Sequence, residues 1–167
     1  QELMQRAWQR AADGQREPAP WPWADTWPVA RLGTRNGEVD LIVLAGGSGR
    51  TLAFGPGHLA ASAMPGDTGN SVIAGHRDTH FRFLQSLGVG DRIRLTTKTG
   101  SHWFEVAQTE VVDSRNSQIL IEPEVERISL VTCYPFDSPS AGGPLRYVET
   151  TLPATTSSLR SLSSGCW

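Results

Sequence analysis

Short apolar or alternating runs, separated by turn residues, dominate the chain from Val29 onward. This pattern is typical of an all-β barrel or sandwich. Strands are expected over 29–32, 38–44, 71–74, 92–97, 102–112, 127–132 and 145–152. Turn-forming sequences such as Asn36-Gly37 and Thr99-Gly100 separate them, because these residues tolerate the backbone angles of tight turns. Short helical turns are expected over 58–63 and 81–87.

In the first 13 residues the apolar positions recur with a different period. Apolar residues recur at the three-and-four spacing of a helix and Gly14 follows as a stop; they are Leu3, Met4, Ala7, Trp8, Ala11 and Ala12. We therefore predict a short amphipathic helix whose apolar stripe packs on its own domain. A role at a membrane surface is the alternative for such a helix.

Prolines and tryptophans alternate over residues 18–28, which excludes a helix and favours an extended strap over the domain. Its tryptophans, Trp21, Trp23 and Trp27, are interpreted as buried packing residues. A ligand for a proline-recognition domain is the alternative. The Ser/Thr-rich tail has little periodicity and is expected to add nothing to the core. The predicted segments are thus a helix and strap over 1–28, a barrel over 29–152 and a tail over 153–167.

Composition narrows the class of protein. A chain of 167 residues fits one domain with a substantial core. A formal net charge of -2 lacks the basic footprint of a nucleic-acid binder, so no nucleic-acid partner is expected. The chain begins with Gln1, and we expect its natural start to lie upstream, where an anchor or signal would not be visible.

The two cysteines, Cys133 and Cys166, exclude a disulfide scaffold and a four-cysteine zinc site. A pairing of the two stays open, although Cys166 lies next to the end of the chain. Cys133 directly follows the predicted strand 127–132, and Pro135 cannot continue a central strand. Catalytic groups are often found at such strand ends. Cys133 is therefore a candidate nucleophile, with a small buried cysteine as the alternative.

Two further residues complete a candidate site for thiol acyl transfer. His76 follows an apolar run at Gly75, and histidine is the residue type best suited to carry protons to and from reacting groups. Arg146, on the last predicted strand, stays protonated and is suited to a developing oxyanion or a substrate carbonyl. A structural histidine and a solvated arginine are the alternatives.

Four separated stretches resemble the sortases, cysteine transpeptidases of the bacterial envelope. The run 129–133, Ser-Leu-Val-Thr-Cys, resembles the family's Thr-Leu-x-Thr-Cys signature, with Ser129 in place of the first threonine. The stretches 75–78 and 145–147 resemble its histidine and arginine motifs, and 90–93 resembles its glycine-aspartate turn. The resemblance covers about 29–152, and the strap is similar to the region before the barrel in sortases of marine proteobacteria.

This resemblance implies a closed β-barrel of about eight strands with short helices. It implies Cys133 as nucleophile, His76 as general acid and base, and Arg146 as the group that orients substrate and stabilises the oxyanion. Thr132 and Tyr134 are expected to bind substrate. The expected reaction is cleavage after the threonine of a Leu-Pro-x-Thr-like sorting motif, through a thioacyl enzyme, and transfer to an amine. No cofactor is expected.

The implied partners are proteins with a C-terminal sorting motif and an amine acceptor. The resemblance also implies an inner-membrane anchor upstream of Gln1, with the catalytic domain in the cell envelope outside the cytoplasm. We expect a monomer.

Other interpretations of the same residues remain. The barrel is alternatively a non-catalytic peptide-binding module, or a transpeptidase of the other cysteine type, whose Ser-x-Gly-Cys signature differs from the residues before Cys133. Imidazoles and a carboxylate that suit zinc occur at His76, Asp78, His80 and His102. Carboxylates that suit calcium occur at Glu105, Glu110, Glu122, Glu124 and Glu126, but without ligand spacing, so no metal requirement is expected.

The end of the predicted barrel carries a sequence that looks like a sorting motif. Leu152, Pro153, Ala154 and Thr155 match it, but Thr156 stands where glycine is expected, which favours chance. The alternative is that the tail occupies the groove of its own enzyme.

Overall fold

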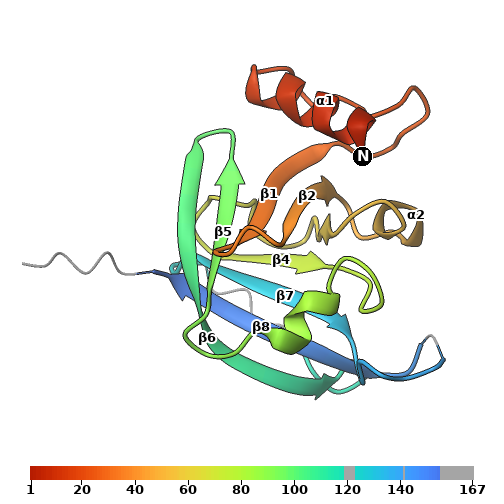
Figure 1. Ribbon diagram of the computed structural model, residues 1–167, viewed down its shortest axis with the longest axis vertical. Coiled ribbons are helices and arrows are strands. Elements are labelled where there is room, and N and C mark those ends of the chain that lie inside the picture. Colours follow the sequence, from red (N-terminus) through yellow and green to blue (C-terminus); the bar gives the residue numbers. More distant parts are fainter. Residues whose placement is uncertain (119–122, 141, 155–167) are drawn as a thin grey trace, which may run out of the picture.

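The structure is a computed structural model and describes residues 1–118, 123–140 and 142–154. Strands of this part of the chain form one closed barrel in the order β1-β2-β3-β4-β7-β8-β6-β5 (Figure 1). They are β1 (Pro28–Thr34), β2 (Asp40–Ala45), β3 (Gly57–His58), β4 (Asn70–Ala74), β5 (Arg92–Thr97), β6 (Gly100–Asp113), β7 (Arg127–Cys133) and β8 (Leu145–Pro153). The predicted all-β class and closed barrel are confirmed.

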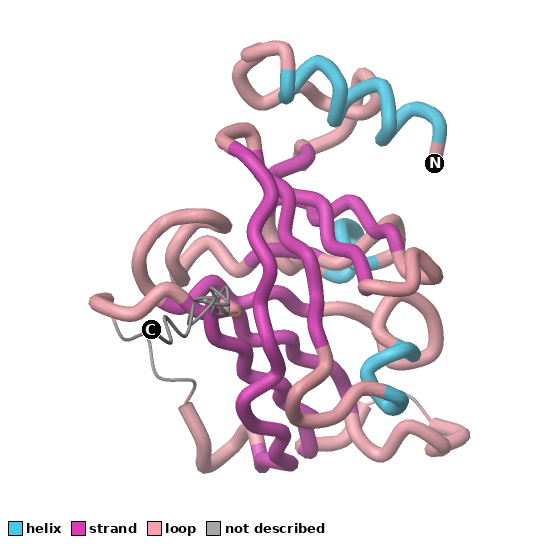
Figure 2. The backbone as a smooth tube through the Cα atoms, turned by 60° about the vertical axis from the view of Figure 1, so that its left-hand side comes forward, coloured by secondary structure: helices cyan, strands magenta, loops and turns pink. Residues whose placement is uncertain are grey.

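Short helices accompany the barrel: α1 (Glu2–Ala12), α2 (Gly49–Leu52) and the 3-10 helix η1 (Arg82–Ser86). Helix α1 lies outside the barrel wall (Figure 2). Its Trp8 is buried against Ile42 and Leu44 of β2, whereas Leu3 is 52% exposed. The predicted packing of the apolar stripe on its own domain is thus confirmed for its central residues.

Two local elements differ from those expected from the sequence. The helical turn expected over 58–63 is wrong, because His58 lies in β3 and pairs with Ile73. The His58 Nε2 atom lies 2.8 Å from the Ala63 carbonyl oxygen, so a side chain closes this turn without a helix. Helix α2 was not predicted, because its four residues are too few to show a period.

The strap is packed less completely than expected. Trp27 packs against the core, and the Trp21 ring lies 4.5 Å from the Phe54 ring, centroid to centroid. Trp23, however, is 79% exposed, so its predicted burial is wrong. In a strap without a regular period, the sequence does not show which face points inward.

The barrel core holds the chain segment that follows β4. Phe81 and Leu84 are fully buried among inward-facing strand residues such as Ile73, Leu130 and Phe104. A Cβ added at Gly75 would lie 2.7 Å from the Phe81 ring, so only glycine allows this close approach. The turn between these two residues, which carries His76, is therefore anchored in the core at its far end.

Candidate active site

Three strands bring separate parts of the chain to one place. Strand β7 pairs parallel with β4 and antiparallel with β8. In Figure 1 the arrowheads of β4 and β7 point to the same side of the barrel, and β8 begins there. The carboxyl ends of β4 and β7 therefore meet the start of β8.

Cys133 and Arg146 face each other across this meeting point. Cys133 is the last residue of β7, and its cross-strand partner is Arg146 near the start of β8. Both residues are half-buried. The Arg146 Nη1 atom donates to the carbonyl oxygens of Gly143, at 2.7 Å, and Leu145, at 2.9 Å. Among the described residues its other guanidinium nitrogens have no partner, so these donors are left for a ligand.

His76 lies one residue beyond the hydrogen bonds that join β4 to β7. The Gly75 amide donates to the Val131 carbonyl at 3.1 Å, and the Thr132 Oγ1 donates to the Gly75 carbonyl at 2.7 Å. The exposed His76 thus follows a residue bonded directly to the segment that ends in Cys133. The structure therefore brings Cys133, Arg146 and the backbone of His76 to one end of the barrel.

A second histidine lies close to His76. The His76 carbonyl accepts hydrogen bonds from the amides of Thr79, at 3.3 Å, and Phe81, at 2.9 Å, so the chain turns back on itself. This turn brings His80 near His76. Burial lowers the pKa of His80, and the neighbouring His76 lowers that pKa further.

The two expected substrate-binding residues lie differently. Thr132 is 2% exposed and its hydroxyl is engaged with Gly75, so the side chain points toward β4. The half-buried Tyr134 donates its amide to the Leu145 carbonyl at 3.1 Å, and its ring meets the Phe136 ring edge-on. Tyr134 is therefore part of an aromatic contact directly after Cys133.

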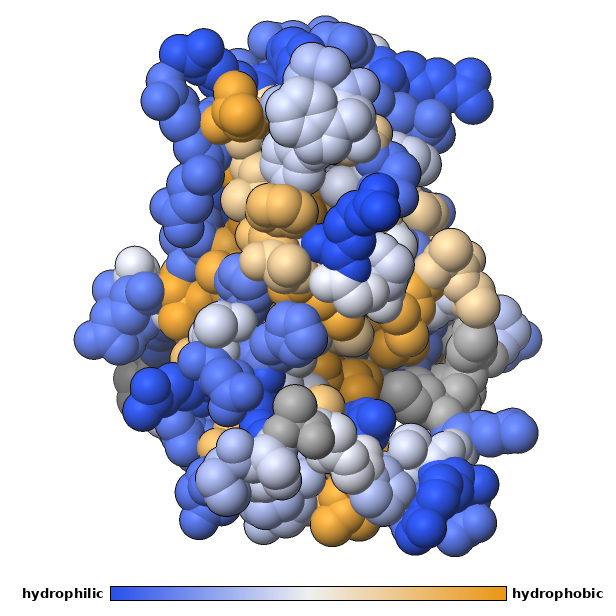
Figure 3. Space-filling view, turned by 90° about the vertical axis from the view of Figure 1, so that its right-hand side faces the viewer, coloured by the Kyte–Doolittle hydropathy of each residue, from blue (hydrophilic) through white to orange (hydrophobic). Residues whose placement is uncertain are grey.

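A groove of about 480 Å3 runs along the outer face of the sheet. Alternating residues of β6, β7 and β8 line it, with Arg146 among them. Val131 also lines it, and side chains two residues apart share a face of a strand, so Cys133 continues the same row. Figure 3 shows the side of the molecule toward which β4 and β7 run, with apolar residues down its middle between polar flanks.

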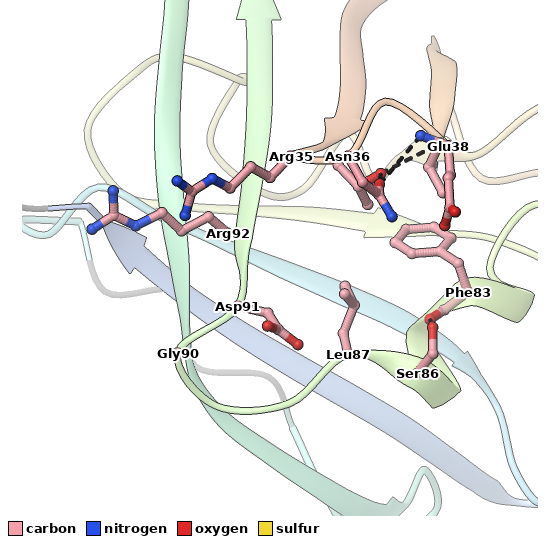
Figure 4. Close-up of a pocket in the computed structure, with 11 residues that line it drawn as sticks. Arg35, Asn36, Glu38, Phe83, Ser86, Leu87, Gly90, Asp91 and Arg92 are labelled. Atoms are coloured by element: carbon pink, nitrogen blue, oxygen red, sulfur yellow. Dashed lines mark hydrogen bonds between the residues drawn. The ribbon is translucent and has the colours of Figure 1, made fainter.

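A larger cavity lies elsewhere. It measures about 730 Å3 and is lined by the turn between β1 and β2, by η1 and by the start of β5. Figure 4 shows Arg35, Glu38, Asp91 and Arg92 around it, together with the apolar Phe83. No cysteine or histidine lines this cavity, so its size does not make it the candidate for acyl transfer.

One residue of the site was missed by sequence reasoning. Arg77 was noted only as part of the histidine motif, yet its side chain is 4% exposed and donates to carbonyls of the segment after Cys133. The sequence offered one signal, an arginine directly after the candidate histidine. Its position in the sequence does not show that the side chain is buried.

The described residues show neither a group of metal ligands nor a membrane-spanning helix. In the described part of the chain, no three His, Cys, Asp or Glu side chains are grouped so that they could hold a metal ion, which leaves the zinc alternative without a ligand set. Within the same ranges, no helix has the length and apolar character needed to cross a membrane. Cys166, Glu122 and Thr155 lie outside the described residues.

The apparent sorting motif near the end of the barrel is part of the sheet. Leu152 pairs with Glu105, Pro153 pairs with Phe104, and the Ala154 amide donates to the Trp103 carbonyl at 2.8 Å. Arg146 and Pro153 lie seven residues apart on one strand, or about 23 Å at the usual rise. These three residues are therefore held away from Cys133.

Comparisons with known proteins were consistent with each other. A family model described as the sortase domain matches residues 33–153. Sortase D of Bacillus subtilis (strain 168) is 36% identical over 112 residues, which are 66% of this chain and 56% of that protein. The chain thus spans about half the length of this curated relative.

Solved structures share the fold. A Clostridium perfringens Sortase D5 transpeptidase has a TM-score of 0.73 at 21% identity, covering 92% of this chain and 97% of its own. Sortase A from Corynebacterium diphtheriae has a TM-score of 0.69 at 23% identity, and the match covers 92% of this chain and 83% of that chain. The expected similarity to sortases of marine proteobacteria is not supported, because the curated relative comes from Bacillus.

Proposed function

This chain belongs to the sortase family, and we propose that it is a cysteine transpeptidase that cleaves a Leu-Pro-x-Thr-like sorting motif and transfers the acyl group to an amine. One observation carries the proposal. Cys133 pairs directly with Arg146 across β7 and β8. The Gly75 amide donates to the Val131 carbonyl and the Thr132 hydroxyl donates to the Gly75 carbonyl, and these bonds hold the start of the His76 turn beside them.

In the first half of the reaction, the Cys133 thiolate attacks the threonine carbonyl carbon of the motif. A C–S bond forms, and the carbonyl oxygen becomes an oxyanion that accepts hydrogen bonds from the unengaged donors of Arg146. The intermediate collapses as the C–N bond breaks. His76 donates a proton to the leaving nitrogen, which leaves a thioester on Cys133.

In the second half, an amine attacks the thioester carbonyl and a new C–N bond forms. His76 accepts the proton of the attacking amine, and the C–S bond breaks to restore the thiolate. Water competes with the amine at this step, so transfer requires that the acceptor be held in position and that water access be limited.

The groove on the outer face of β6, β7 and β8 is the proposed site of the sorting peptide. It leads along β7 toward Cys133, and Arg146 lines its near end, so a peptide in it would present its carbonyl to both groups. Tyr134 is proposed to contact the peptide beside the cysteine. Substrate contact by Thr132 stays a prediction; the Gly75 bond supports a role in holding the strand end.

The proposed partners are envelope proteins with a C-terminal sorting motif and an amine acceptor. Family membership supports action in the cell envelope. Anchoring in the inner membrane by a segment upstream of Gln1, with the catalytic domain outside the cytoplasm, is part of the proposal. The absence of a cofactor or metal requirement and the monomeric state also stay predictions.

The test is incubation with labelled Leu-Pro-x-Thr-Gly peptides, with and without an amine, followed by intact mass spectrometry. We expect a thioester on Cys133 that the amine converts to a transfer product. Cys133→Ala should abolish the adduct, whereas Cys166→Ser should retain it. Saturable peptide binding without any adduct, over a panel of motif variants, would instead identify a peptide-binding module and contradict the proposal.

A further inference from the structure

Arg77 is a buried charge beside the candidate site. Its side chain is 4% exposed, although arginine is almost never fully buried unless it is paired. Its Nη1 atom donates to the Pro135 carbonyl at 2.9 Å, and Nη2 donates to the carbonyls of Ser138, at 3.1 Å, and Ser140. Three backbone carbonyls thus surround one guanidinium group.

These carbonyls all belong to the connection from Cys133 to Arg146, of which the structure describes 134–140 and 142–144; we call it the cysteine–arginine loop. The acceptors lie 58 to 63 residues from Arg77 in the chain. Within the loop, the described hydrogen bonds join close neighbours, such as the Ser138 amide with the Pro135 carbonyl at 3.4 Å. Arg77 therefore links this loop to the turn that carries His76.

The carboxylate partner of Arg77 contributes little to this arrangement. Asp78 lies 3.3 Å from the Arg77 Nε atom, but its side chain is 69% exposed. An ion pair with an exposed partner is weak, because water screens the attraction. Hydrogen bonds from a charged donor that is itself buried are stronger, so the carbonyls of the loop hold the guanidinium.

We propose that Arg77 is a positioning residue for acyl transfer. It holds the cysteine–arginine loop against the turn that carries His76. This inference rests on the proposed function. Arg77 does not touch the substrate; it acts by fixing where His76 lies relative to Cys133 and Arg146. Misplacement of reacting groups by about 1 Å can cost about 100-fold in rate, which sets the size of the expected effect.

The planar guanidinium group is suited to this role and an ammonium group is not. Arginine presents five donors in a fixed fork, so it reaches carbonyls of three different residues at once. Lysine has three donors on a single atom and cannot span the same acceptors. Arg77→Lys should therefore keep the buried charge but lose the geometry, and Arg77→Met should lose both.

The experiment compares Arg77→Lys, Arg77→Met and a matched control, Arg82→Met. Arg82 is an exposed arginine five residues further along, in η1. Measurements are made at a temperature at which circular dichroism shows each variant to be fully folded. The readouts are kcat and KM for a labelled sorting peptide, amide hydrogen exchange over 134–144, and the pH profile of Cys133 alkylation by iodoacetamide.

We expect kcat to fall about 100-fold in Arg77→Met and about 10-fold in Arg77→Lys, with KM changed less than about 3-fold. Exchange over 134–144 should become faster and the alkylation profile should shift, while Arg82→Met stays as wild type. In an additional variant, Arg77→Ala, added methylguanidinium should partly restore kcat. An unchanged exchange rate, or a kcat that follows only the folded fraction, would overturn the inference.

Failure of the proposed function would look different. If the wild-type protein formed no thioester with any motif variant, the function would be wrong, but exchange and alkylation would still decide whether Arg77 positions the loop. If Arg77→Met does not fold, Arg77→Lys decides the outcome, because it retains the charge.

Discussion

Glu149 gives a quantitative test of the interior of the barrel. It lies on β8 opposite Leu130 of β7 and Thr109 of β6, and it is fully buried. Neither carboxylate oxygen has a hydrogen-bond partner among the described residues. Burial, with a smaller contribution from repulsion by Asp91, raises the pKa of Glu149 from 4.5 to about 7.

The sign of the effect on stability follows from this raised pKa. Between pH 4.5 and 7 the folded state binds the proton of Glu149 more tightly than the unfolded state does. The free energy of unfolding therefore falls as the pH rises through this window. A difference of about 2.5 pKa units corresponds to about 3 kcal/mol, of which about 2.5 kcal/mol is lost between pH 5 and pH 8.

The perturbation is Glu149→Gln, which removes the titration and retains the shape. Urea unfolding of wild type and variant is measured at half-unit steps from pH 5 to pH 8 at constant ionic strength. The variant should gain about 2.5 kcal/mol relative to wild type over this range. The stability of Glu149→Gln at any single pH is less informative, because the buried glutamine amide also lacks hydrogen-bond partners.

Subtracting the unfolding free energy of wild type from that of Glu149→Gln also cancels the contributions of other titrating groups. Burial lowers the pKa of His58, which makes stability rise with pH, but this contribution is common to both proteins. Glu110→Gln, an exposed site on β6, serves as the control and should show a flat difference. If the Glu149→Gln difference changes by less than about 0.5 kcal/mol over this range, the carboxyl is not held protonated and the reasoning is refuted.

Four further predictions concern the site and its supports. Arg146→Ala should lower kcat for a sorting peptide by about 100- to 1000-fold, and a loss below about 10-fold would contradict its oxyanion role. Gly75→Ala should lower the free energy of unfolding in urea by about 1–3 kcal/mol, because the new Cβ meets the Phe81 ring at 2.7 Å; equal stability would show that the ring moves aside. Thr132→Val should cost about 1–3 kcal/mol in the same assay, with Thr132→Ser as the control that keeps the hydroxyl. Removal of residues 155–167 should leave peptide turnover unchanged, and faster turnover would indicate that the tail competes for the groove.

Much of the barrel could be predicted because strand formation leaves a local signal. Alternation along 92–97 and 127–132 reflects residues that point alternately to the core and outward, so the period of two is present in the sequence. Strand β3 could not be predicted, because two residues carry no period. The exposure of Trp23 was missed for a similar reason, since the strap lacks regular structure.

The chemistry of the candidate site was also visible locally, whereas its geometry was not. Cys133 before a proline turn and His76 after an apolar run are features of short segments. Which residue faces Cys133 depends on the register of β7 with β8, and that register is a tertiary property.

The sequence by itself determined the strand faces, the chain turns and the residue types available for acyl transfer, because each depends on neighbours within a few positions. Only the tertiary structure decided that Arg77 would be buried against carbonyls about 60 residues away and that Glu149 would lie inside the barrel. The physical reason is that burial and pairing depend on segments distant in the chain, whose contacts form only when the barrel closes.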